Sequence, residues 1–253
     1  AGHWIGWDTV QMVEINPFCQ KVLKKHYPNA ALHDDIKTFT LEVLKKSRWN
    51  ETDATIICCG DPCQPSSVAG KRQASEDQRY LWPENYRAIK EILPTVIVNE
   101  NVPGTISNGI LDEKISNLET IGYSCWPPFI IPASASGAPH KRDRVWLVAY
   151  SDSLRGHQRF HIGEAGHVQE NLQRHVAQVQ SKWAQLKPKS WEASTARDWL
   201  RYNASISRGN NGISTKLDRS RIKALGNSIV PQVVYPFLQY IQYTYRFGFE
   251  GVK

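Results

Sequence analysis

Over its first 150 residues the chain alternates apolar runs with amphipathic segments. Apolar runs at residues 53–60 and 95–99 end in glycine or polar residues, and a shorter run covers residues 9–14. Such continuous runs are typical of strands buried in a parallel sheet. Helical periodicity occupies residues 84–93 and 111–121. The pattern predicts an α/β fold with a doubly wound, mostly parallel sheet and chemistry at the carboxyl ends of its strands.

Local signals place the ends of these elements. Asn16 and Pro17 supply an N-cap and a first-turn proline for a helix, whereas Pro94 and Gly122 end the two helices predicted above. Two further strands are expected near residues 123–131 and 144–150, and an apolar helix should reach about residue 245.

The composition and the hydrophobic pattern change after Tyr150. The following 60 or so residues are rich in Gln, His, Arg, Gly and Trp, with weak periodicity and no long apolar run. We therefore expect three parts: residues 1–150, a loop-rich segment at 151–215, and a return to ordered structure at 216–253.

The charge follows the same division. The chain has 31 basic and 24 acidic residues, a net charge of +7. Residues 1–150 contain 16 basic and 17 acidic residues, net −1, and the remaining 103 contain 15 and 7, net +8. A basic segment of this size favours a polyanionic partner, although surface solubility would account for part of it.

Other compositional features argue against a membrane or secreted protein. No run approaches 18 apolar residues, and the first residues lack a secretory signal. Five cysteines are an odd number, which disfavours a disulfide scaffold and favours free thiols. The predicted location is the cytoplasm.

Cys63 lies just past the end of the run at residues 53–60. A thiolate there would be a strong nucleophile at the ligand-binding edge of the sheet, although a structural cysteine is an equally good interpretation of position alone. Glu100 follows the next strand, and Arg142 and Arg144 lie just before another. Glu100 and the two arginines are each common as solvent-exposed residues. Together with Cys63, however, they would supply a nucleophile, an acid and a cationic clamp.

With these residues the sequence resembles the cytosine-C5 DNA methyltransferases. Five motifs occur in the order found in that family: Pro62-Cys63-Gln64 with Ser67, Asp77-x-Arg79-x-Leu81-Trp82, Glu100-Asn101-Val102, His140-x-Arg142-x-Arg144 and Gly226-Asn227-Ser228. Two departures are visible, since Ser66 replaces the usual Phe and His140 the usual Gln.

The resemblance implies a reaction and roles for four catalytic residues. Cys63 would add to carbon 6 of cytosine, so that carbon 5 becomes able to attack the methyl group of S-adenosylmethionine. Glu100 would contact ring N3 and the exocyclic amine and keep N3 protonated. Arg142 and Arg144 would hold the target nucleotide and lower the pKa of the thiol.

A thiol cannot reach a base inside a duplex, so the base must be flipped out. The implied DNA-binding residues lie in the loop that begins with the cysteine motif: Gln64, Ser67, Lys71 and Arg72. The alternative is an ordinary basic loop.

For the cofactor, S-adenosylmethionine, the resemblance implies binding by residues at several strand ends. These are Glu14 (ribose), Ile15 and Ile36 (adenine faces), Asp35 (adenine amine), Leu81 (adjacent wall), Asn227 and Ser228 (methionine end), and Asp61. The alternative for Glu14 is a plain surface acid. No metal is expected, because adjacent Cys58 and Cys59 on a strand point to opposite faces.

In this family a strand and a Gly-rich loop that cradles the cofactor precede a helix like residues 1–6. Neither occurs in this sequence, whose only methionine is Met12. We therefore expect the sequence to be a fragment of a longer product.

By resemblance, residues 151–215 form the target-recognition segment. Its basic residues could neutralise phosphates or contact guanine edges: Arg155, Arg159, Arg174, Lys182, Lys187, Lys189, Arg197, Arg201 and Arg208. A disordered basic linker is the alternative, although Trp183, Trp191 and Trp199 supply apolar mass for packing.

The expected function is therefore that of a monomeric DNA (cytosine-5-)-methyltransferase of bacterial or phage restriction–modification type. Its partners would be double-stranded DNA and a cognate restriction endonuclease. One alternative is an inactive DNA-binding remnant. Another is an amino-methyltransferase, since Asp61-Pro62 begins like that class's Asp-Pro-Pro-aromatic motif, but Cys63 and Gln64 disagree with it.

Overall fold

The computed structural model of the protein describes residues 2–62, 80–136, 142–153 and 231–247. Its helices are η1 (Gly2–Ile5), α1 (Pro17–His26), α2 (Leu41–Lys45), α3 (Trp82–Ile92), α4 (Gly104–Ser107), α5 (Ile110–Thr120), η3 (Ala133–Ser136) and α9 (Pro231–Phe247). Its strands are β1 (Gln11–Val13), β2 (Ala31–His33), β3 (Ile56–Gly60), β4 (Val96–Asn101), β5 (Tyr123–Cys125), β6 (Phe129–Pro132) and β7 (Asp143–Ser151).

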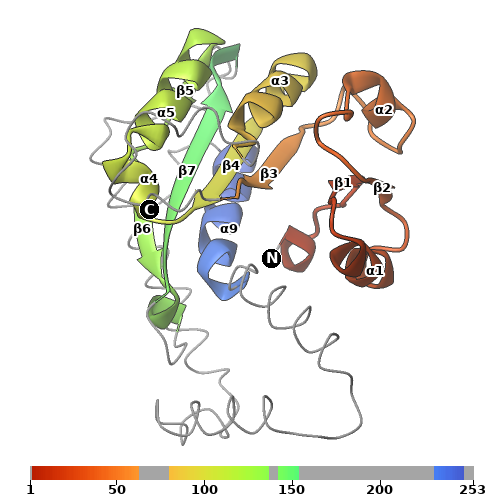
Figure 1. Cartoon of the computed structure of the whole chain (residues 1–253), viewed down its shortest axis with the longest axis horizontal. Coiled ribbons are helices and arrows are strands. Elements are labelled where there is room, and N and C mark those ends of the chain that lie inside the picture. The colour runs from red at the N-terminus through yellow and green to blue at the C-terminus, as the bar shows by residue number, and fades with distance from the viewer. Residues whose placement is uncertain (1, 63–79, 137–141, 154–230, 248–253) are drawn as a thin grey trace, which may run out of the picture.

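The strands form two sheets. In the larger, β3 pairs in parallel with β4, and β7 runs antiparallel to β4, β5 and β6 (Figure 1). The smaller contains the parallel pair β1 and β2. This confirms the α/β class. The antiparallel β7, which the hydrophobic pattern does not reveal, makes the sheet mixed.

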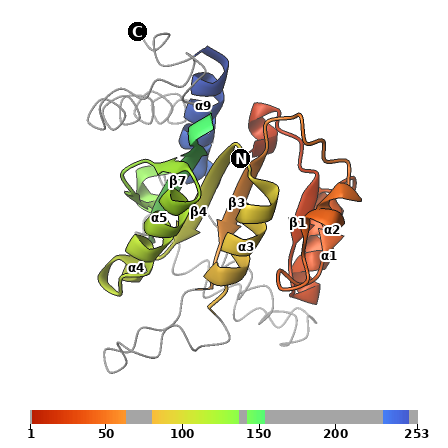
Figure 2. The same cartoon turned by 90° about the horizontal axis from the view of Figure 1, so that it is seen from above.

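Helices cover both faces of the larger sheet. In Figure 2, α9 lies on one face and α3, α4 and α5 on the other. The alternation of side chains along a strand explains this arrangement. Val96 and Val98 of β4 pack in the cluster that contains α9, whereas Ile97 between them packs with residues of α3 and α5.

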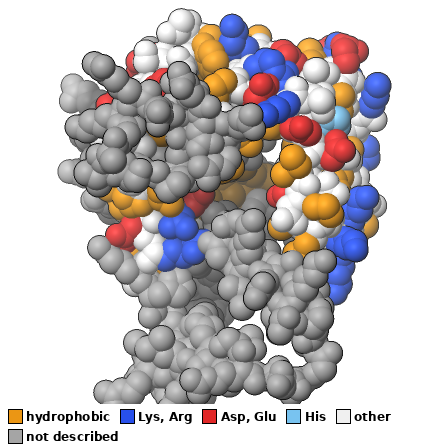
Figure 3. Space-filling model, viewed as in Figure 1, with side chains coloured by type: hydrophobic (Ala, Val, Ile, Leu, Met, Phe, Trp, Pro, Cys, Tyr) orange, Lys and Arg blue, Asp and Glu red, His pale blue; other side chains and the backbone are white. Residues whose placement is uncertain are grey.

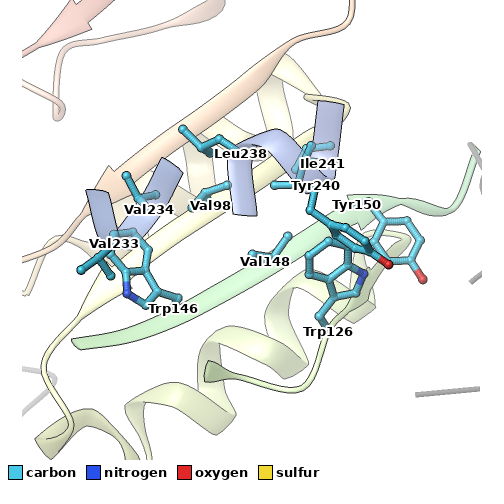
Figure 4. Close-up of a cluster of buried hydrophobic side chains, with 11 residues drawn as sticks. Val98, Trp126, Trp146, Val148, Tyr150, Val233, Val234, Leu238, Tyr240 and Ile241 are labelled. Atoms are coloured by element: carbon cyan, nitrogen blue, oxygen red, sulfur yellow. The ribbon is translucent and has the colours of Figure 1, made fainter. Parts of the chain in front are cut away.

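The α9 face of the core is mostly aliphatic and aromatic (Figure 4). Val234 and Leu238 of α9 pack over Val98, and Trp126 meets Tyr240 with ring centroids 5.6 Å apart. Each large side chain buried here contributes about 1.5–3 kcal/mol of transfer free energy. This packing ties a helix near the C-terminus to the middle of the sheet.

The predicted element ends are largely confirmed. Asn16 caps α1, its Oδ1 accepting hydrogen bonds from the backbone N–H groups of Phe18 and Cys19. The single strand expected at residues 123–131 is wrong. It is divided into β5 and β6, because Pro127 and Pro128 cannot donate backbone hydrogen bonds to a ladder.

The burial of β3 differs from the expected two-sided burial. Cys58 is exposed, although it lies in the middle of the strand. Within the described residues β3 pairs only with β4, so its other edge has no neighbouring strand.

No helix in the described ranges is long and apolar enough to cross a membrane.

Candidate active site

The structure describes nine of the predicted site residues: Glu14, Ile15, Asp35, Ile36, Asp61, Leu81, Glu100, Arg142 and Arg144. Seven others lie outside the described residues: Cys63, Gln64, Ser67, Lys71, Arg72, Asn227 and Ser228. The site is therefore built here from the strand ends that surround the start of the cysteine motif.

Gly60 and Glu100 lie side by side at the carboxyl ends of β3 and β4. They are direct partners in the parallel ladder. A Cβ atom on Gly60 would lie 3.2 Å from Oε2 of Glu100, closer than an ordinary contact. The absence of a side chain at residue 60 thus leaves room for the Glu100 carboxylate next to the cysteine motif.

Arg144 holds the carboxylate of Glu100. Its Nε lies 2.6 Å from Oε1 of Glu100, and both side chains are less than one-fifth exposed. Burial raises the pKa of Glu100 above its ordinary value, and the attraction of Arg144 and Arg142 opposes this rise. The geometry therefore presents a carboxyl group that is both oriented and more easily protonated than an exposed one.

Arg142 and Arg144 owe their positions to the pairing of β6 with β7. Pro132 pairs with Asp143 and Ile131 with Arg144, while the carbonyl of Arg142 accepts a hydrogen bond from the Ala133 N–H. Arg142 adopts a left-handed backbone conformation, with φ of 39°. Such a conformation is uncommon outside glycine and recurs at functional sites. Both arginines are close enough to Glu100 for their charges to act on its carboxylate.

Asp61, one of the predicted cofactor residues, has its side chain turned into the protein. It is buried, and its carboxylate receives hydrogen bonds from side chains of three elements. Asn85 of α3 donates to Oδ1, whereas Lys114 of α5 and Asn99 of β4 donate to Oδ2. Because both carboxylate oxygens accept hydrogen bonds from other residues of the protein, this side chain has a structural role.

Sequence reasoning missed Lys114, Asn99 and Asn85. Lys114 is 1% exposed, which is rare for a lysine without a charged partner. The signal was its place in the helical repeat, since the buried residues of α5 are Ile110, Leu111, Lys114 and Leu118. A lysine on the apolar face of a helix predicts a buried acidic partner.

The other end of the site lies at β1 and β2. These parallel strands end just before Glu14 and Asp34, so that Glu14 and Asp35 lie at one edge of their sheet. Ile15 beside them is 70% exposed. Carboxylates can accept hydrogen bonds from ribose hydroxyls or an adenine amine, and an exposed isoleucine can cover a purine ring. These residues fit a nucleoside, and Figure 3 shows the surface hollowed between this part and the main sheet.

The two remaining cofactor candidates are more enclosed. Ile36 packs against the cluster of Phe39, Leu44 and Ala88, and Leu81 is half-buried directly before α3. Because they are only partly exposed, these two side chains can line the wall of a cofactor site but do not form an open surface.

Arg87 of α3 fixes the segment that follows β2. Its guanidinium pairs with Glu84 and Glu91 of its own helix and donates from Nη2 to the backbone carbonyls of Ile36 and Phe39, both at 2.8 Å. The segment that carries Asp35 is therefore attached to the helix that packs beside β3.

Known proteins of one family match the chain. Residues 3–221 match the family model of the C-5 cytosine-specific DNA methylases. Type II methyltransferase M.AquIA of Picosynechococcus is 30% identical over 74% of this chain and 77% of its own length. M.Eco47II of Escherichia coli is 34% identical over 52% of this chain, which spans only 36% of that relative.

Among solved structures, the DNMT2 of Spodoptera frugiperda is 25% identical, with a TM-score of 0.46 over 57% of this chain and 43% of that one. The ordered motifs, the strand-end carboxylate with its arginines, and a family model that covers most of the sequence agree. The chain belongs to the C-5 cytosine-specific DNA methylases, a family of S-adenosylmethionine-dependent enzymes.

Proposed function

We propose that this chain methylates carbon 5 of cytosine in double-stranded DNA, with Cys63 as the nucleophile. The observation that carries the proposal is the half-buried pair of Glu100 and Arg144 at the strand end next to Gly60, three residues before Cys63. Family membership supports the reaction class, and the pair supplies the acid and cation that this reaction needs.

In the proposed reaction the Cys63 thiolate forms a bond to carbon 6 of a flipped-out cytosine. Electron density moves toward N3, where Glu100 supplies and holds a proton. Arg144 keeps the Glu100 carboxyl in place, and Arg142 beside it provides positive charge for the nucleotide. Once carbon 5 has taken the methyl group that S-adenosylmethionine supplies, loss of the carbon 5 proton and departure of Cys63 restore the aromatic ring, and the N3 proton returns to Glu100.

S-Adenosylmethionine supplies the methyl group when it is bound. Glu14 would accept hydrogen bonds from its ribose and Asp35 from its adenine amine, with Ile15 and Ile36 against the adenine and Leu81 at the wall. Asn227 and Ser228 would contact its methionine end. The exposed apolar surface of Ile15 beside two carboxylates supports this assignment.

DNA would be held by residues from two parts of the chain. Gln64, Ser67, Lys71 and Arg72 would surround the flipped base. Residues 151–215 would recognise the target sequence, between a catalytic domain at residues 1–150 and its continuation at 216–253. The net charge of +8 after Tyr150 supports contact with phosphates. Action as a monomer, in the cytoplasm of a bacterium or of a phage-infected cell and together with a cognate restriction endonuclease, completes the proposal.

The test is a covalent trap. The protein is incubated with S-adenosylmethionine and a randomised pool of duplex DNA in which cytosine is replaced by 5-fluorocytosine. Fluorine blocks the final elimination, so a stable protein–DNA adduct is expected. Cys63→Ala should abolish the adduct, while the control Cys59→Ala should retain it, because burial raises the pKa of the Cys59 thiol to about 12 and keeps it protonated.

The alternatives give different outcomes in the same assay. DNA binding without an adduct or methyl transfer indicates an inactive remnant, and methyl transfer without an adduct indicates an amino-methyltransferase. An adduct that survives Cys63→Ala would refute the assigned nucleophile.

A further inference from the structure

We propose that a buried ion pair between Asp61 and Lys114 positions the nucleophile by fixing the backbone at the end of β3. Only its catalytic consequence rests on the function proposed above. Asp61 directly follows β3 and precedes Cys63 by two residues, so a restraint on Asp61 is a restraint on the start of the cysteine motif. Together with Asn85 and Asn99, the pair forms what we call the anchor.

The anchor connects Asp61 to three separate elements. Lys114 of α5 forms an ion pair with Oδ2 of Asp61, and their side chains are 1% and 3% exposed. Lys114 also donates to Oδ1 of Asn99 at 2.9 Å, and its Nζ lies 5.0 Å from the centre of the Trp82 ring. Asn85 of α3 holds the other oxygen of Asp61. The carboxylate is thus restrained from β4, α3 and α5 at once.

The anchor lies on the opposite face of the sheet from Glu100. Successive residues of β4 point to opposite faces, so Asn99 points toward α3 and α5 while Glu100 points with Val98 to the α9 face. Consequently, Asp61 and Lys114 can restrain the end of β3 from the face that α3 and α5 cover, without occupying the space next to Glu100 on the other face.

A buried ion pair is a poor means of gaining stability, because desolvation of two charges offsets much of their attraction. A neutral, well-packed pair would hold helix and sheet together as well. What the ion pair with its two amides adds is a fixed direction for one carboxylate, and hence for the backbone to which that carboxylate is attached. This distinction makes the proposal testable.

The decisive protein is the double variant Asp61→Asn with Lys114→Met. Each single change leaves a buried charge without its partner, and is expected to lower the midpoint of thermal unfolding sharply. The double variant removes both charges and is expected to unfold near the wild-type temperature. The matched control is Glu42→Gln with Lys45→Met, which removes an exposed ion pair of 3.1 Å on α2.

Two measurements follow on the double variant. Amide hydrogen exchange in peptides that cover the end of β3 is expected to become about tenfold faster, with no change in peptides from β1 and β2. Formation of the 5-fluorocytosine adduct at saturating DNA and S-adenosylmethionine is expected to become about tenfold slower, with both dissociation constants unchanged. A stable double variant with wild-type exchange, or with a wild-type adduct rate, would overturn the proposal.

If the double variant fails to fold, Asn85→Ala decides. It removes the hydrogen bond to Oδ1 of Asp61 and leaves no charge unpaired. Faster exchange at the end of β3 together with a slower adduct rate supports the anchor, and wild-type values of either one refute it. A wild-type protein that forms no adduct refutes the proposed function instead, and hydrogen exchange then decides the anchor alone.

Discussion

At the scale of single residues, Gly60 matters because it has no side chain and so leaves room for the carboxylate of Glu100. Gly60→Ala would place a Cβ atom 3.2 Å from Oε2 of Glu100, so the carboxylate must move by a few tenths of an ångström against its pairing with Arg144. We expect a three- to tenfold slower adduct rate, measured with 5-fluorocytosine DNA, and little change in thermal unfolding.

A contrasting control is Gly109→Ala. Gly109 has a φ of 78° and open space around it, so the substitution should cost about 1 kcal/mol of unfolding free energy and leave the adduct rate unchanged. A Gly60→Ala protein that traps DNA at the wild-type rate would contradict the assigned role of this close approach.

Glu100 gives a second prediction, in which the charge is removed and the shape kept. Glu100→Gln should slow adduct formation by about 100-fold, because the amide cannot supply a proton to N3. Single-turnover trapping measures this rate. Glu42→Gln, the same exchange at an exposed residue of α2, is the control and should leave the rate unchanged. A small effect of Glu100→Gln would exclude proton supply by Glu100.

The raised pKa of Glu100 also predicts how stability depends on pH. A carboxyl group whose pKa is higher in the folded state stabilises that state below its ordinary pKa of 4.5, and this contribution is lost as the pH rises through the raised value. The unfolding temperature of wild type relative to Glu100→Gln should therefore fall as the pH rises from 4.5 through the raised pKa of Glu100. A margin that grows with pH would mean that pairing with Arg144 outweighs burial.

At the scale of elements, α3 connects the two ends of the site. Arg87 bonds the carbonyls of Ile36 and Phe39, and Glu91 of the same helix accepts from the N–H of Leu41. Arg87→Ala should release the segment that carries Asp35. We expect about 1–2 kcal/mol lower unfolding free energy and a several-fold weaker affinity for S-adenosylmethionine by calorimetry. Arg48→Ala, which removes an exposed pair with Asp8, should leave that affinity unchanged.

Elements also show how far the sequence predicts the structure. β3, β4, α3 and α5 follow from apolar runs and helical periods, with ends set by Pro94 and Gly122. The three-residue β2 and five-residue α2 are too short to give a periodic signal. The antiparallel direction of β7 depends on pairing partners that are distant in the sequence, and a pattern along one segment carries no direction.

The candidate site, too, is only partly predictable from the sequence. Glu100, Arg142 and Arg144 were predicted as a group, and the structure brings them together. Asp61 is a cofactor residue by resemblance, and nothing in the sequence indicates which side chains its carboxylate contacts. Its true partners, Asn85 and Lys114, are separated from it by 24 and 53 residues, and only packing of α3 and α5 against the sheet brings them together.

At the scale of the whole molecule, charge separates the catalytic half from the basic remainder. Figure 3 shows Lys and Arg side chains gathered at the edge that carries α1 and α2, but the excess of positive charge follows Tyr150. DNA affinity should therefore fall steeply with salt, and replacing a basic residue of this later segment, as in Arg174→Gln, should reduce the slope of log K against log salt by about one if that residue neutralises a phosphate. Lys25→Gln on α1 is the matched control. Equal effects of both would contradict a dominant role for the later segment.

The direction of β7 also limits how this molecule can be rebuilt. Trp146, near the start of β7, pairs with Glu100, and the last residue of β7, Ser151, lies about 17 Å farther along the strand, toward the opposite end of the sheet. The chain returns at α9, whose Val233 packs near Trp146, the residue paired with Glu100. The described residues that flank residues 154–230, Ser153 and Pro231, therefore lie toward opposite ends of the sheet. A chimera in which residues 154–230 are replaced needs a segment whose two ends reach across this length of the sheet, so the span limits the choice of donor in addition to its sequence.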